Sequence, residues 1–347
     1  MPTALKFLSA GCVLSLALCC ALLGSSGMWP AWSSLGIADD ALPVVSSRFQ
    51  NHPSAIPKWR SEGGTVVPPP AAAPSLVQAV SIPAIAIPLA AGPLSGLPAV
   101  VTPASADTTI STPPVLARPP RMPAGPLPGV LRTPAGIGPF PAVILLHGCG
   151  GPFNGMPDWA YRLNAWGYAV LMPDSMTPRG VRTVCDPDEQ PKVTPWDRVG
   201  DIGAAAAWLR TRPEIDPDRI AVLGLSHGGM TAALAVQAPY AAMRLRAAVD
   251  YYGPCYEPRL HGAVPLLVLA GESDDWGDPA ARCRTYGDAL RPDQPFEIHT
   301  YPGVYHAFDG GSTAKTVRSG HVLAYDRAAA EDSFVRVRGF LDRYLRF

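Results

Sequence analysis

The fold is decided by one stretch, "RIAVLGLSHGGMTAALAV", residues 219–236. It begins with an apolar run that is typical of a buried β-strand. The chain then turns through Ser226 between glycines and continues as an alanine-rich run that is typical of a helix. A strand, a glycine-flanked serine and a helix in direct succession predict a sharp turn that holds the serine hydroxyl clear of a β-sheet. The turn itself, Gly224 to Gly228, fits the pattern G-x-S-x-G.

Alternating strands and helices are predicted on both sides of this turn, from residue 141 to the end of the chain. Apolar runs predict strands at 142–148, 168–174, 219–225, 246–253, 264–275 and 295–303. Helices are predicted at 156–167, 197–213, directly after Ser226, 278–291 and 328–345. Continuously apolar strands that alternate with helices predict an α/β fold, a mostly parallel sheet with helices on both faces. In such sheets, functional side chains gather just beyond the carboxyl ends of the strands.

The serine needs partners, because a serine hydroxyl is a weak nucleophile at neutral pH. It requires a base, and the base requires an acid that orients it. On a turn of this kind the chain order is serine, acid, histidine. His306 lies in the loop after the last predicted strand, and His227 lies inside the turn and is predicted to point elsewhere. We therefore predict Ser226 as the nucleophile and His306 as the base.

The acid should follow the strand that precedes the histidine loop. Asp274 and Asp275 both stand just past that strand, and either could reach His306. We predict Asp274 as the acid and keep Asp275 as the alternative. Asp278 directly precedes Pro279, so it is predicted to cap the next helix instead.

An oxyanion that develops on the substrate needs two backbone N–H donors. One is predicted to be the N–H of His227, the residue after the nucleophile. The other should come from the loop after the first core strand, "LLHGCGG", where glycines permit close approach and Cys149 is the predicted donor. Because this donor belongs to the backbone, the Cys149 thiol has no predicted chemical role.

The N-terminal third has a different composition. Lys6 precedes about seventeen apolar or small residues, which is typical of a secretory signal. Residues 1–38 are therefore predicted to be a signal peptide or, if uncleaved, an N-terminal membrane anchor. Residues 53–128 contain 18 prolines, which remove hydrogen-bond donors and fix φ. We predict a disordered Pro/Ala-rich tether at residues 39–125 and a catalytic domain at residues 126–347.

These features predict an exported protein, periplasmic or secreted, with envelope tethering through its N-terminus as an open alternative. The formal net charge is +0 at pH 7 and no basic run is present, which argues against a nucleic-acid partner. Beyond the signal, the cysteines are Cys149, Cys185, Cys255 and Cys283. Their spacing does not choose among the disulfide connectivities or against free thiols, and it indicates no metal site.

At these residues the chain resembles the dienelactone hydrolase family of α/β-hydrolases. The motifs that carry the resemblance occur in family order over 126–347: "PAVILLHGCGG", "GYAVLMPDS", "RIAVLGLSHGG", "GESDDW", "YPGVYHAF" and "YDRAAAEDSFVRVRGFLDRYL". The resemblance implies the α/β-hydrolase fold and a monomeric or weakly associated hydrolase that needs no cofactor. It assigns the triad to Ser226, Asp274 and His306, and the oxyanion donors to Cys149 and His227.

Two departures from the family pattern are visible. Dienelactone hydrolases use cysteine where this chain has Ser226, and the glutamate that accompanies that cysteine has no counterpart at His147–Gly148. The arginines that bind the dienelactone carboxylate are not readily placed. Arg179 is a candidate for binding an anionic substrate, with a surface loop arginine as the alternative.

Taken together, the motifs predict a serine hydrolase that cleaves a small-molecule ester or lactone through an acyl-enzyme. Another hydrolase with the same triad, a peptidase or an acyltransferase, remains an alternative. A third alternative, from a different class, is a non-catalytic envelope binding protein on a hydrolase fold.

Overall fold

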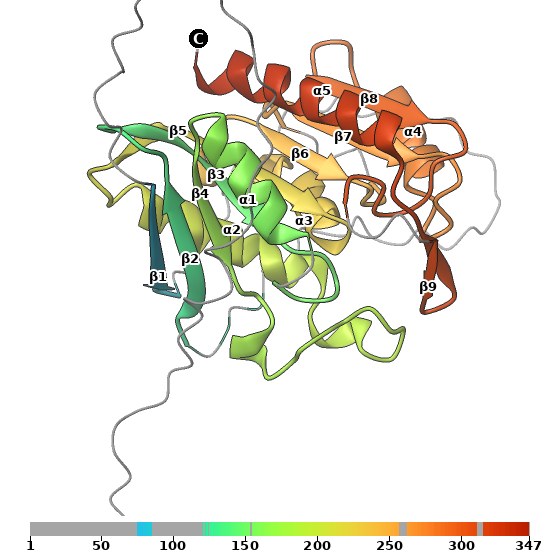
Figure 1. Cartoon of the computed structure of the whole chain (residues 1–347), viewed down its shortest axis with the longest axis horizontal. Helices are drawn as coiled ribbons and strands as arrows, with labels where there is room; N and C mark the ends of the chain where they lie inside the picture. Colours follow the sequence, from blue (N-terminus) through green and yellow to red (C-terminus); the bar gives the residue numbers. More distant parts are fainter. Residues whose placement is uncertain are drawn as a thin grey trace, which may run out of the picture. The chain divides into compact units, whose positions relative to one another are not determined.

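A computed structural model describes residues 75–84, 121, 123, 125–152, 155–256, 262–310 and 315–346. Its centre is an eight-stranded sheet with the strand order β1-β2-β4-β3-β5-β6-β7-β8 (Figure 1). The strands are β1 (Leu76–Ile82), β2 (Leu127–Thr133), β3 (Phe140–Leu146), β4 (Ala169–Pro173), β5 (Ile215–Leu225), β6 (Ala248–Tyr251), β7 (Leu266–Gly271) and β8 (Phe296–Tyr301). A separate small hairpin is formed by β9 (Thr316–Arg318) and β10 (His321–Leu323).

Strands β4, β3, β5, β6, β7 and β8 pair in parallel, whereas β1 and β2 pair antiparallel at one edge. The helices are α1 (Met156–Ala165), α2 (Pro195–Leu209), α3 (His227–Ala235), α4 (Pro279–Asp288) and α5 (Arg327–Leu345). Short 3-10 helices lie at η2 (Thr177–Arg179), η3 (Gln190–Lys192) and η4 (Ala238–Met243). This arrangement confirms the predicted α/β-hydrolase fold.

The helices form a layer on each face of the sheet. One buried cluster joins α2, α3 and α4 to the strands, and a second joins α1 and α5 to the opposite side chains of the same strands. In β5, for example, Val222 belongs to the first cluster and Leu223 to the second. Adjacent residues of a strand point to opposite faces, so a strand covered on both faces must be apolar along its whole length. This explains the continuous apolar runs in the sequence.

Helix α2 sits close against the sheet for local reasons. It begins at a capping box in which Thr194 and Asp197 satisfy each other's backbone N–H groups. Its alanines, Ala204 to Ala206, are fully buried, and their small side chains let the helix axis approach the strands. The close fit of α2 also buries Arg198, which this helix carries.

The edge strand β1 corrects one sequence prediction. Residues 39–125 were predicted to form a disordered tether, but Leu76–Ile82 pairs with β2 along seven register positions. These seven residues contain no proline, so the argument against a hydrogen-bonded ladder does not apply to them. At the end of the strand, Ile82 is fully buried in the core. The folded domain therefore reaches further toward the N-terminus than the predicted boundary at residue 126.

The predicted signal or anchor at residues 1–38 and the rest of the predicted tether, apart from the residues given above, lie outside the described part of the chain. Among the described helices, none combines the length and the apolar character that crossing a bilayer requires.

Candidate active site

Ser226 lies on a sharp turn between β5 and α3, with φ 54° and ψ −115°. This positive φ is rare for a residue with a Cβ, and the packing around the turn enforces it. A Cβ at Gly224 would lie 2.0 Å from the Gly228 carbonyl oxygen, and one at Gly228 would lie 2.6 Å from the Leu146 oxygen. Only glycine fits at these two positions, so the G-x-S-x-G pattern is a steric requirement of the turn.

His306 connects the serine to an acid. Its Nε2 lies 2.9 Å from Ser226 Oγ, and its Nδ1 lies 2.7 Å from Asp274 Oδ2. Asp274 and His306 are both buried, with 4% and 3% of their surfaces exposed. The second oxygen of Asp274 accepts a hydrogen bond from the Trp276 backbone N–H at 2.9 Å. The structure thus brings together the serine, histidine and aspartate that the sequence analysis selected.

The structure also separates the two candidate acids. Asp275 contacts a different histidine, with 3.3 Å between its Oδ1 and His321 Nδ1. The same oxygen accepts a hydrogen bond from the Val322 N–H at 3.4 Å, so Asp275 attaches the β9–β10 hairpin to the loop after β7. The geometry favours Asp274 as the acid and gives Asp275 a different partner. Asp278 accepts from the Ala281 N–H at 3.3 Å and caps α4, as predicted.

The two predicted oxyanion donors flank the serine. Cys149 lies in the loop after β3, and His227 is the first residue of α3, where backbone N–H groups have no partner within the helix. The Cys149 sulfur forms a disulfide with Cys185, which ties the loop after β3 to the segment between β4 and α2. A second disulfide joins Cys255 and Cys283. The Cys149 side chain is therefore no thiol nucleophile, in agreement with the sequence interpretation.

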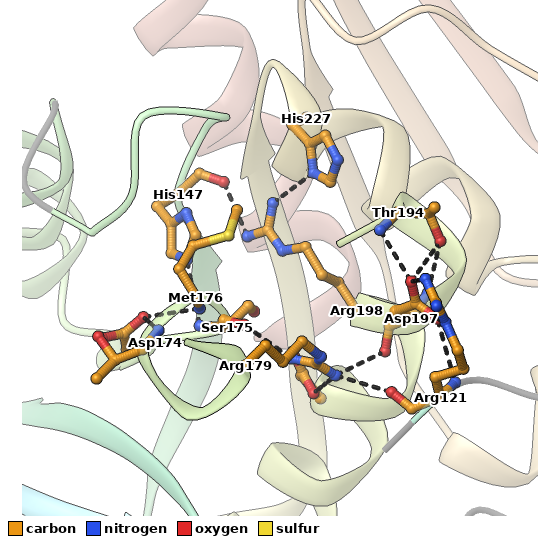
Figure 2. A network of polar contacts seen from close by, with 12 residues as sticks. Arg121, His147, Asp174, Ser175, Met176, Arg179, Thr194, Asp197, Arg198 and His227 are labelled. Atoms are coloured by element: carbon orange, nitrogen blue, oxygen red, sulfur yellow. Dashed lines mark hydrogen bonds and ion pairs between the residues drawn. The ribbon is translucent and has the colours of Figure 1, made fainter. Parts of the chain in front are cut away.

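The ring of His227 lies in a buried polar network with Arg198 (Figure 2). Its Nδ1 lies 2.8 Å from Nη1 of Arg198. Burial and the neighbouring Arg198 charge lower the pKa of His227 to about 3, which a hydrogen bond with the Val193 backbone partly offsets. The ring is therefore neutral at pH 7.

Arg179 belongs to the same network and is not placed as a substrate ligand. Both of its Nη atoms lie 2.9 Å from the carboxylate of Asp201, and they also donate to backbone carbonyls. Its side chain is 10% exposed, and that of Asp201 is fully buried. Nor is it among the described residues that line the cavities at Ser226. Both sequence interpretations of Arg179, as a ligand for an anionic substrate and as a surface loop arginine, are corrected, because its guanidinium pairs with a buried carboxylate.

Two cavities border Ser226, with volumes of about 360 Å³ and about 630 Å³. Ser226, Cys149 and Trp276 line both. The Trp276 ring lies 5.0 Å from the His306 ring and stacks on His321 at 4.9 Å. Both cavities combine charged side chains with aromatic rings. The smaller one is lined by Asp158, Arg162, Asp309 and Arg318 together with Trp159, Tyr252, Tyr325 and Phe334, and the larger one by Arg282 together with Trp196 and Tyr256.

One buried carboxylate in the smaller cavity was missed by the sequence analysis. Asp309 accepts hydrogen bonds from Trp159 Nε1 at 2.6 Å and from the Tyr252 hydroxyl at 2.8 Å. Burial raises the pKa of Asp309, which the two donors partly offset. The Tyr252 ring in turn lies 4.6 Å from the His306 ring. Asp309 thus fixes an aromatic wall beside the base, and its place three residues after His306 is the one signal in the sequence that could have indicated it.

Among the described residues, one buried cluster has the residue types that bind metal ions. Asp250, Cys255 and Cys283 place one ligand atom each within 4.8 Å of one another. Cys255 and Cys283 are joined as a disulfide, however, and metal ions bind cysteine as the thiolate. This cluster consequently has only the Asp250 carboxylate to offer, and we assign no metal to it.

Comparison with known proteins agrees with this geometry. Residues 127–345 match the model of the dienelactone hydrolase family. An uncharacterized protein of Mycobacterium tuberculosis is 30% identical over 191 residues, which cover 49% of this chain and 64% of that protein. A Synechocystis protein named "Putative carboxymethylenebutenolidase" is 22% identical over 247 residues, which cover 63% of this chain and 92% of the relative.

A solved structure shows the same fold. It is that of a dienelactone hydrolase-like promiscuous phosphotriesterase from metagenomic libraries, with a TM-score of 0.51, 20% identity, and coverage of 64% of this chain and 94% of that one. Because the family model covers more than half of its length, the chain belongs to the dienelactone hydrolase family. It spans 64% of the length of the Mycobacterium relative.

Proposed function

We propose that this protein hydrolyses carboxylic esters or lactones through a Ser-His-Asp triad and an acyl-enzyme. The observation that carries the proposal is the continuous hydrogen-bonded path from Ser226 Oγ through His306 to Asp274. A serine on a strained turn, a base within hydrogen-bond distance and a buried acid on the far side of the base are the parts that acyl transfer requires. Membership of the dienelactone hydrolase family supports the same reaction class.

In the first half of the reaction, Ser226 Oγ attacks the ester carbonyl carbon while its proton passes to His306 Nε2. The carbonyl oxygen becomes an oxyanion that accepts hydrogen bonds from the backbone N–H groups of Cys149 and His227. Asp274 holds His306 in the required orientation and stabilises the imidazolium. The tetrahedral intermediate then collapses, and His306 gives the proton to the leaving alkoxide, which departs as an alcohol.

In the second half, His306 takes a proton from water, and the resulting hydroxide attacks the acyl carbon of the acyl-enzyme. The same two N–H groups hold the second oxyanion. Collapse breaks the bond to Ser226 Oγ, which recovers its proton from His306. The products are a carboxylic acid and the free enzyme. No step uses a group other than these residues and water.

The two cavities support a substrate with a substantial group on each side of the scissile bond. They meet at Ser226, where Trp276 lines both. Aromatic rings and charged side chains line both cavities, so each suits a group that combines an apolar or aromatic part with a polar substituent. A lactone would release both groups as one hydroxy acid. The name of the Synechocystis relative supports lactones among the substrates.

The test is hydrolysis of p-nitrophenyl esters of increasing acyl length by the full chain and by Ser226→Ala. We expect turnover by the wild type and a loss of about 10⁴-fold or more in kcat for the variant. Stoichiometric labelling of Ser226 by a fluorophosphonate should accompany turnover. A Ser226→Ala variant with the wild-type rate would overturn the mechanism, and a wild type that neither turns over nor labels would favour a binding protein on the same fold.

We also propose that the protein works in an oxidising compartment, as an exported enzyme. The apolar N-terminal run supports this, and so do the two disulfides, since structural disulfides persist in oxidising environments. Fractionation of producing cells, with mass spectrometry of the N-terminus, tests it. Recovery of the chain from the cytosol, with the four cysteines Cys149, Cys185, Cys255 and Cys283 reduced, would contradict it.

A further inference from the structure

Helix α2 carries a fully buried arginine, Arg198, whose guanidinium lies between His147 and His227 (Figure 2). Its Nη1 lies 2.8 Å from Nδ1 of His227. Its Nη2 donates to the backbone carbonyl of His147, also at 2.8 Å. Arginine is rarely buried completely, because removing its charge from water is costly unless the contacts it makes are good ones. The two contacts of Arg198 must therefore compensate for the burial of its charge.

The two contacts of Arg198 lead to the two halves of the oxyanion site. His227 follows the nucleophile and carries one proposed N–H donor. The His147 carbonyl belongs to the peptide unit directly before the one that carries the Cys149 N–H, the other proposed donor. A guanidinium is planar and rigid, so its two Nη atoms hold their acceptors at a nearly constant separation. One side chain thereby fixes the loop after β3 relative to the start of α3.

The packing between these two segments leaves little room for adjustment. A Cβ at Gly228 would lie 2.7 Å from the same His147 oxygen that Arg198 binds. A Cβ at Gly148 would lie 3.4 Å from the Leu225 oxygen. The loop after β3 thus rests directly on the turn at Ser226. If the hydrogen bond to the His147 carbonyl is lost, we expect the loop to shift along this contact and to carry the Cys149 N–H out of position.

Arg198 also brings a positive charge to this place. Burial lowers its pKa to about 10, which leaves the guanidinium protonated at pH 7. Asp201 is the main acidic neighbour acting on it, but both oxygens of Asp201 already accept hydrogen bonds from Arg179. The hydrogen bonds of Arg198 go instead to a neutral ring and a carbonyl. Its charge is therefore only partly balanced, and it favours an anion that forms at the neighbouring donors.

We propose that Arg198 is a positioning residue that aligns the two backbone oxyanion donors of this enzyme and stabilises the oxyanion through its buried charge. The proposal rests on the proposed function, since it assigns a role within the same reaction. It concerns the transition state more than the bound ester, because the oxyanion forms only after attack. Loss of Arg198 should therefore lower kcat and leave KM nearly unchanged.

The test compares Arg198→Met and Arg198→Lys with the wild type on a matched pair of substrates, an aryl ester and its thionoester. In the thionoester, sulfur replaces the carbonyl oxygen and is a weak hydrogen-bond acceptor, so the reaction depends less on the donors. We expect kcat for the ester to fall about a hundredfold in Arg198→Met, with KM within about twofold. The ester-to-thionoester ratio of kcat should fall about tenfold or more. Arg198→Lys keeps the positive charge but has a single compact donor group. Its ester-to-thionoester ratio should lie between those of the wild type and Arg198→Met.

Arg179→Met is the matched control, because it removes a neighbouring arginine whose partners are Asp201 and backbone carbonyls outside the two donor loops. It should lower the melting temperature and change the ratio less than Arg198→Met does, because both contacts of Arg198 to the donor segments remain. A parallel fall on both substrates in the Arg198 variants would overturn the proposal and leave Arg198 a purely structural role. If Arg198→Met does not fold, the ratio in Arg198→Lys decides. A wild type without ester turnover would instead overturn the proposed function, and this proposal with it.

Discussion

Two buried histidines neighbour Ser226, His227 in the sequence and His306 in space, and they differ in what holds Nδ1. His306 Nδ1 lies 2.7 Å from the Asp274 carboxylate, whereas His227 Nδ1 lies 2.8 Å from the Arg198 guanidinium. A carboxylate only accepts hydrogen bonds, so it places the proton on Nδ1 of His306 and leaves Nε2 as an acceptor that faces the serine. A guanidinium only donates, so it requires a lone pair on Nδ1 of His227.

The consequence is that the two rings have different chemical capacities. His306 has an acceptor nitrogen that faces Ser226 and a carboxylate on its other nitrogen. His227 faces a cation at Nδ1, and burial together with that charge lowers its pKa to about 3. Both histidines are buried, so the partner at Nδ1 is what distinguishes the ring that can act as a base.

The largest effect on activity is expected when the Asp274 carboxylate beside His306 is removed. In Asp274→Asn the amide can donate a hydrogen bond to Nδ1 of His306. The ring then carries its proton on Nε2, which faces Ser226 and can no longer accept the serine proton. We expect kcat to fall by about 10⁴-fold with the fold intact. Ester hydrolysis and circular dichroism measure the two effects. A fall of less than about tenfold would show that Asp274 is not the acid.

The loop after β3, which Arg198 contacts, is also attached by the disulfide Cys149–Cys185. The disulfide Cys255–Cys283 serves as the control. Cys149–Cys185 and Cys255–Cys283 close loops of similar length, with sequence separations of 36 and 28. Replacing either pair by serines should lower the free energy of unfolding by about 4 kcal/mol. Only loss of Cys149–Cys185 should also lower kcat, by about tenfold, because Cys149 carries a proposed oxyanion donor. Urea unfolding and ester turnover test this, and equal activity losses in both would count against it.

The lowered pKa of His227 predicts a pH dependence of stability. The unfolded chain protonates this histidine below about pH 6.5, whereas the folded protein does so only near pH 3. Between these values the unfolded state binds one more proton, so folding stability falls as the pH falls. His227→Asn keeps an acceptor for Arg198 but has no ring to protonate. Below pH 6, its free energy of unfolding should fall less steeply than that of the wild type, by about 1.4 kcal/mol per pH unit. Urea unfolding at several pH values gives this slope, and parallel slopes would contradict the assignment.

The smallest effect is expected at the second Asp–His pair. Asp275 and His321 lie 3.3 Å apart, but their side chains are 52% and 32% exposed, and an exposed ion pair contributes little. Asp275→Asn should change kcat/KM by no more than about threefold. A loss that approaches that of Asp274→Asn would reverse our choice between the two acids.

The sequence predicted the central sheet and the triad because both depend on local patterns. Continuous apolar runs mark strands covered on both faces, and the steric limits at Gly224 and Gly228 are visible as a short motif. Chain order and position after a strand were enough to select His306. The choice between Asp274 and Asp275 was harder, because adjacent residues point to opposite sides and only the folded loop shows which one faces the base.

The features that escaped prediction depend on contacts between distant segments. Arg198 is one of several charged residues at the start of α2, and nothing in its surroundings distinguishes it from an exposed arginine. Its burial follows from where α2 packs. The disulfide partners of Cys149 and Cys255 likewise depend on the fold, since four cysteines are compatible with several pairings. Strand β1 was missed because its partner β2 is distant in the sequence and its flanks are rich in proline.

Strand β1 has a consequence for where this protein can be cut. The family match begins at residue 127, but the sheet begins at Leu76, and Ile82 is part of the core. A protease that removed residues up to the family boundary would strip the outer strand from β2 and expose a row of unpaired N–H and C=O groups. Such an edge readily pairs with another chain. The segment that the family model matches is therefore shorter than the folded unit that contains it.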